Sequence, residues 1–153
     1  VIKKFPRTLL LIVGEGPEMH ALRRTVYSLW LGDNVRFEGW QENLSQYYKF
    51  SDLFLSTSNY EGYGMAMAEA IGNGLPVITT DVGLAGEVVK NGENGLVVPV
   101  GDKARLTEAV LKFLEDGNLR LKLKESAGKT KPYYQSFEDY IDKLINSWRI
   151  CGK

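Results

Sequence analysis

One stretch of the chain, residues 52–80, constrains the fold most strongly, because short apolar runs alternate in it with glycine turns. Leu53–Ser56 is a short apolar run, and Glu61–Gly64 is a turn with two glycines, which accept backbone conformations that other residues avoid. Met65–Ile71 is rich in strong helix formers, further glycines and Pro76 close that segment, and Val77–Thr80 begins as a second apolar run. So short a strand–helix–strand unit predicts two parallel strands joined by a right-handed crossover.

Two glutamates, Glu61 and Glu69, lie eight positions apart on either side of the start of this helix. We expect the helix to begin near Gly64, where the first N–H groups have no partner within the helix and attract anions. Glu69 then lies ~7.5 Å along the helix axis. Because carboxylates accept hydrogen bonds from hydroxyl groups, the pattern predicts a site for a phosphate with sugar hydroxyls on either side, as in a nucleotide sugar. The alternative is a plain strand–turn–helix with two solvated glutamates.

The segment from Glu61 to Val77 resembles the E-x7-E signature of retaining glycosyltransferases of family 4, which have the GT-B architecture. The family pattern is roughly S-x-x-E-G-F-G-x-x-x-x-E-A-x-A-x-G-x-P-V. The residues of this chain that match the pattern are Ser58, Glu61, Gly62, Gly64, Glu69, Ala70, Gly74, Pro76 and Val77. The resemblance covers nearly all of the 153 residues and implies the C-terminal, donor-binding domain of such an enzyme.

The resemblance also implies roles for these residues. Glu61 is the catalytic candidate, which would contact the donor sugar and hold charge near the anomeric carbon, and Glu69 would bind the ribose hydroxyls. The residues implied to bind sugar and phosphate through backbone N–H groups are Gly62, Tyr63, Gly64 and Met65. The donor would be a UDP, GDP or ADP sugar, the acceptor a glycan, a lipid or a small molecule, and the reaction would use neither a metal nor a cofactor.

Two earlier turns are further candidates for the nucleotide crevice. The apolar run 8–13 is continuous, which is typical of a strand buried on both faces of a parallel sheet, and Gly14-x-Gly16 follows it. Gly39, Trp40 and Gln41 follow a second expected strand at 35–37. Ligands of parallel sheets bind at the carboxyl ends of the strands, so we expect both turns near the site. The alternatives are a plain tight turn for the two glycines and partly buried packing for Trp40.

The order of apolar runs and helical segments predicts an α/β fold. Expected strands at 8–13, 35–37, 53–56, 77–80 and 96–98 indicate a Rossmann-like parallel sheet of about five strands with helices on both faces, which is one half of a GT-B fold. Residues 1–153 are short enough for a single domain. Leu119–Lys124 alternates like a strand, but its residues are good helix formers, so we predict a helix. Asp102 and Ser136 are expected N-caps.

Composition excludes several other functions. Nineteen basic residues balance nineteen acidic ones, so bulk charge gives no argument for nucleic acid. A single histidine and the single Cys151 cannot form a usual zinc site, and no D-x-D pair is present to hold a divalent ion. One cysteine favours a reducing, cytoplasmic location. Basic residues between 120 and 131 suit either a solvated face or peripheral contact with an anionic membrane.

Two parts of a complete enzyme are not recognised in the sequence. The family carries a basic pair for the diphosphate after the first strand of this domain, and we expect that strand and the acceptor-binding domain to precede Val1. Leu84 also replaces the second of two adjacent glycines that the family usually has. We therefore expect this chain alone to be inactive. The alternatives are a non-catalytic nucleotide-sugar-binding module and, with less support, a GT-B epimerase acting on a UDP-sugar.

Overall fold

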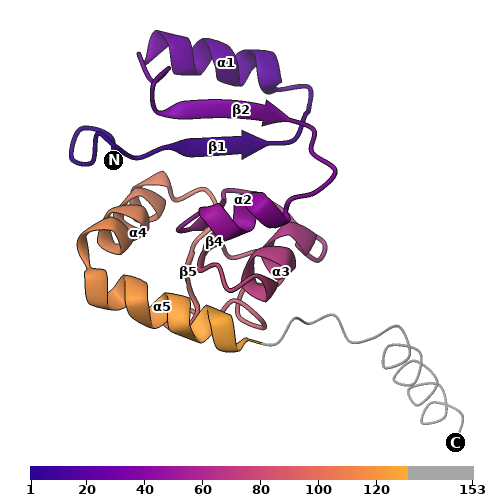
Figure 1. The fold of residues 1–153 in the computed structure, drawn as a ribbon, viewed down its shortest axis with the longest axis vertical. Coiled ribbons are helices and arrows are strands. Elements are labelled where there is room, and N and C mark those ends of the chain that lie inside the picture. The colour runs from indigo at the N-terminus through magenta and orange to yellow at the C-terminus, as the bar shows by residue number, and fades with distance from the viewer. Residues whose placement is uncertain (131–153) are drawn as a thin grey trace, which may run out of the picture.

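The computed structural model describes residues 1–130, in which strands and helices alternate along most of the chain (Figure 1). The strands are β1 (Leu10–Val13), β2 (Val35–Gly39), β3 (Phe54–Ser56), β4 (Val77–Thr80) and β5 (Gly95–Val98). The helices are α1 (Met19–Ser28), α2 (Ser45–Phe50), α3 (Met65–Gly72), α4 (Lys103–Glu115) and α5 (Gly117–Lys129). All five expected strands are confirmed. The α/β, Rossmann-like class is confirmed as well.

The strands pair in parallel, as expected, but in two separate sheets. β1 pairs with β2, and β3, β4 and β5 form a three-stranded sheet with β4 in the middle. In the part of the chain that the structure describes, β1 and β3 each have a hydrogen-bonded neighbour on one side only. Five strands therefore form, but they do not join into one continuous sheet.

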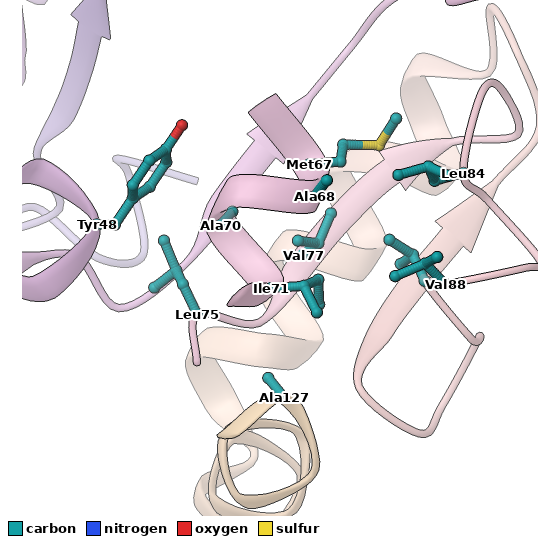
Figure 2. Packing of buried hydrophobic residues seen from close by; sticks show 11 residues of the cluster. Tyr48, Met67, Ala68, Ala70, Ile71, Leu75, Val77, Leu84, Val88 and Ala127 are labelled. Atoms are coloured by element: carbon teal, nitrogen blue, oxygen red, sulfur yellow. The ribbon is translucent and has the colours of Figure 1, made fainter. Parts of the chain in front are cut away.

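The three-stranded sheet carries a hydrophobic core on both faces. Every residue of β4 is buried, and neighbouring residues of the strand belong to different clusters, because side chains alternate across a strand. Val77 packs in the cluster of α3, which Figure 2 shows, and Ile78 packs in the cluster of α4, around Phe113. Helix α5 contributes Leu123 to one cluster and Ala127 to the other. The start of α3 is thus fixed on a rigid base.

The unit formed by β1, α1 and β2 is much less covered. None of residues 1–43 is fully buried, and Leu9 and Leu10 are 45% and 42% exposed. The expectation that the apolar run 8–13 is buried on both faces is therefore wrong for this structure, because the described residues cover β1 only in part. The guanidinium of Arg23 on α1 lies 4.4 Å from the ring centre of Phe37 on β2, which joins helix and strand.

Helices α4 and α5 agree with the predictions made from the sequence. Residues 119–124 lie within α5, so the helix prediction is confirmed and the strand alternative is not. Asp102 caps α4, as expected, by accepting a hydrogen bond of 2.9 Å from the backbone N–H of Arg105. Asp116 caps α5 in the same way through the N–H of Leu119. The N-cap expected at Ser136 lies outside the described residues.

Candidate functional site

The glycine turn leads directly into the N-terminus of α3. Gly64 precedes the helix in a left-handed conformation with φ of 94°, and no side chain caps the helix there. A Cβ atom on Gly64 would contact only the flexible end of the Met67 side chain closely, so the left-handed conformation, rather than space, favours glycine there. Gly62 and Met65 on either side are exposed. The helix therefore presents an end without a side-chain cap to solvent, and such an end favours anions.

Glu61 is held by a short chain of hydrogen bonds that begins at the end of β4. The hydroxyl of Thr80 donates to the backbone carbonyl of Ser58 at 2.6 Å, and the hydroxyl of Ser58 donates to Oε1 of Glu61 at 2.9 Å. Thr80 is buried at the carboxyl end of its strand, so the loop that carries Glu61 is tied to the sheet. This places the carboxylate at the edge where ligands of parallel sheets bind.

Glu69 is held from a different element. The hydroxyl of Tyr48, the only buried residue of α2, donates to Oε2 of Glu69 at 2.9 Å. Within residues 1–130, neither Glu61 nor Glu69 forms an ion pair. Both carboxylates thus have one oxygen fixed by a hydroxyl, which leaves hydrogen-bonding capacity on the other oxygen.

The loop of residues 81–86 packs against the glycine turn at Glu61–Gly64. Gly83 has φ of 55°, and a Cβ atom there would lie 2.6 Å from the carbonyl oxygen of Tyr63 and 3.1 Å from Cβ of Glu61. Leu84, which replaces the second glycine of the family pattern, is buried in the core near Val88 (Figure 2). Sequence reasoning assigned no role to Gly83. The only sequence feature that pointed to Gly83 was its position as the first of two adjacent glycines that the family usually has.

The turns that follow β1 and β2, at Gly14 and Gly39, lie next to each other. The N–H of Gly14 donates to the carbonyl of Gly39 at 2.7 Å, and both glycines have positive φ. Trp40 is 74% exposed, so the alternative of partly buried packing is wrong for its ring. The side chain of Gln41 donates to the carbonyl of Glu38. Gly16 is exposed, and a Cβ atom on it would meet nothing within 4 Å, so space does not require a glycine there.

A groove of about 630 Å³ lies beside these turns. Its lining residues are Leu11, Trp40, Gln41, Glu42, Asn43, Gln46, Tyr47 and Phe50. Neither Glu61 nor Glu69 is among them. The groove thus brings together two of the crevice candidates but does not include the E-x7-E residues.

Helix α2 connects these two parts of the molecule through adjacent tyrosines. Tyr47 donates a long hydrogen bond of 3.3 Å to Glu38 on β2, whereas Tyr48 donates to Glu69 on α3. Burial and the neighbouring Glu38 carboxylate raise the pKa of Tyr47 above its usual value. Through these two hydrogen bonds, α2 links β2 to α3.

Among residues 1–130, no group of three or more His, Cys, Asp and Glu side chains is placed to hold a metal ion. No helix in the same range is long and apolar enough to cross a membrane.

Residues 1–130 match the family described as glycosyl transferases group 1, so the match includes the glycine turn and both glutamates. The chain belongs to this family. The group 1 domain is 32% identical over 139 residues to N-acetyl-alpha-D-glucosaminyl L-malate synthase of Bacillus anthracis, with 91% of this chain and 35% of that relative covered. It is 31% identical over 143 residues to poly(glycerol-phosphate) alpha-glucosyltransferase of Bacillus subtilis, with 93% and 21% covered.

Solved structures agree on the fold of the group 1 domain. HepE of Anabaena, solved in complex with UDP, superposes with a TM-score of 0.79 at 24% identity over 93% of this chain and 42% of that one. Sucrose-phosphate synthase of Thermosynechococcus elongatus superposes with a TM-score of 0.81 at 27% identity, with 98% and 40% covered. The domain therefore has the fold of GT-B glycosyltransferases, and it spans about a third of the first relative and about a fifth of the second.

Proposed function

We propose that this domain is the C-terminal, donor-binding half of a retaining glycosyltransferase of family 4 that transfers a sugar from a nucleotide diphosphate sugar. One observation carries the proposal. The uncapped start of α3 lies between two carboxylates, each of which is fixed by one hydroxyl and has no cationic partner within residues 1–130. An anion seat between two hydroxyl acceptors suits the phosphates and sugar hydroxyls of such a donor.

Each residue of the turn then has a distinct task. Glu61 contacts the donor sugar and holds positive charge that develops near the anomeric carbon. The backbone N–H groups of Gly62–Met65 bind sugar and phosphate, and Glu69 binds the ribose. The leaving diphosphate is stabilised by the end of α3 and by basic side chains, and the reaction needs no metal. The adjoining turns at Gly14 and Gly39 line the nucleotide crevice.

The donor domain works only with parts that lie outside the 153 residues. A first strand with a basic pair for the diphosphate precedes the domain, and an acceptor-binding domain completes the enzyme. The edges of β1 and β3 that have no paired strand, together with the exposure of Leu9 and Leu10, support one further parallel strand between the two sheets. The single cysteine and the nature of the donor support a cytoplasmic location.

The experiment is a turnover assay on the protein at its natural length, with a panel of UDP-, GDP- and ADP-sugars. We expect release of the nucleoside diphosphate from one donor, and NMR of the product should show retained anomeric configuration. Chelation of divalent ions should leave the rate unchanged. A donor that binds but is never hydrolysed or transferred would indicate a binding module, and isomerisation of the sugar while it stays on UDP would indicate an epimerase. Either result would contradict the proposal.

A further inference from the structure

We propose that Tyr48 is the positioning residue of the ribose site: its hydroxyl fixes the Glu69 carboxylate in the orientation that receives the ribose hydroxyls. The inference rests on the proposed function and adds a residue outside the E-x7-E signature. Its basis is the hydrogen bond of 2.9 Å between Tyr48 Oη and Glu69 Oε2, which joins residues on two different helices, 21 positions apart in the chain.

The ring of Tyr48 is itself held firmly. It is 8% exposed, belongs to the core cluster of α3, and lies with its ring centre 6.3 Å from that of Phe54 on β3. Ala70 and Leu75 belong to the same cluster, and Figure 2 shows the Tyr48 ring extending from α2 with its hydroxyl directed away from Leu75. A side chain packed in this way has little freedom, so its hydroxyl is a fixed donor.

Glu69 needs such a donor because no other hydrogen bond and no ion pair within residues 1–130 holds its carboxylate. Its backbone carbonyl bonds to Asn73, but its carboxylate receives one hydrogen bond, from Tyr48, and forms no ion pair in that range. A glutamate side chain that is free to rotate loses conformational entropy when it binds a ligand. By fixing Oε2, Tyr48 lowers that cost and leaves Oε1 to accept from the ribose.

The competing explanation is structural: the hydrogen bond would only attach α2 to α3. The two explanations differ in what the removal of the hydroxyl does to the choice of ligand. A positioning role affects ligands with ribose hydroxyls, whereas a purely structural role affects all nucleotides equally.

The test is titration calorimetry on the protein at its natural length. The probes are whichever of UDP, GDP and ADP binds best and the 2′,3′-dideoxy form of the same nucleotide. Tyr48→Phe keeps the ring in the core and removes only the hydroxyl. Tyr27→Phe is the matched control, because Tyr27 is 79% exposed on α1 and its stacking on Trp30 survives the change.

We expect Tyr48→Phe to weaken binding of the ribonucleotide about fivefold to thirtyfold and to leave the dideoxy form unchanged, while Tyr27→Phe matches the wild type. Added to Glu69→Ala, Tyr48→Phe should have no further effect. In turnover, the donor KM should rise at constant kcat. Equal loss for both nucleotides, or no loss for either, would overturn the positioning role. If the wild type binds none of the three nucleotides, or Glu69→Ala binds like the wild type, the proposed function itself fails and the inference with it.

Discussion

Replacing Gly83 by alanine tests whether loop 81–86 holds the glycine turn in its binding geometry. The new Cβ atom would lie 2.6 Å from the carbonyl oxygen of Tyr63, which is about 0.7 Å shorter than a close carbon–oxygen contact of roughly 3.3 Å. Either Gly83 or the turn must move by about that distance. The left-handed backbone of Gly83 adds a cost of about 1–2 kcal/mol for alanine.

We expect Gly83→Ala to lower the free energy of unfolding by about 2–5 kcal/mol, the sum of the conformational cost and an overpacking cost of about 1–3 kcal/mol. A shift of this size in the turn would also lengthen hydrogen bonds from its N–H groups beyond their normal range. We therefore expect nucleotide-sugar affinity to fall about tenfold to a hundredfold. Chemical denaturation and titration calorimetry measure the two effects.

Gly86→Ala provides a matched control in the same loop. Gly86 also has positive φ, of 82°, but a Cβ atom there would meet nothing within 4 Å. It should show the conformational cost of about 1–2 kcal/mol without any change in affinity. If Gly83→Ala and Gly86→Ala bind the donor equally well, loop 81–86 does not support the turn, and this part of the reasoning is refuted.

Two further substitutions separate catalysis from stability. Ser58→Ala removes the hydrogen bond that fixes Glu61, so kcat in steady-state kinetics should fall about tenfold. The affinity for the nucleoside diphosphate, measured by calorimetry, should stay within about twofold of the wild type. An unchanged kcat would mean that this hydrogen bond is not needed. Phe113→Ala leaves a cavity at a fully buried position between β4 and α4, so it should lower the free energy of unfolding by about 3–5 kcal/mol. Leu121 on α5 is 58% exposed, so Leu121→Ala should change that free energy by less than about 1 kcal/mol. Equal effects of the two substitutions in chemical denaturation would contradict the assignment of the core.

Local sequence pattern was enough to predict the elements of this fold. Short, mainly apolar runs predicted all five strands, and helix propensity correctly outweighed the alternation of residues 119–124. The capping role of Asp102 was also predictable, because it depends on neighbours within three residues. These features share one property: their causes lie within a few positions of the residue concerned.

The parts that could not be predicted depend on contacts between distant segments. The division into two sheets depends on which strand edges find a partner, which no local pattern of β1 or β3 reveals. The hydroxyl of Tyr48 reaches Glu69 only because α2 packs beside α3, and Gly83 supports Tyr63 only because two loops meet. The exposure of Trp40 also depends on what covers β2 and its following turn rather than on residue type.

The most direct test of the account is whether Glu69 and Glu61 affect different parts of one donor. Titration calorimetry should compare the wild type, Glu69→Ala and Glu61→Ala with a nucleoside diphosphate and with the matching nucleotide sugar. We expect Glu69→Ala to lose affinity for both ligands, whereas Glu61→Ala should still bind the diphosphate but lose the additional affinity that the sugar provides. Binding of both ligands by both variants at wild-type affinity would contradict it.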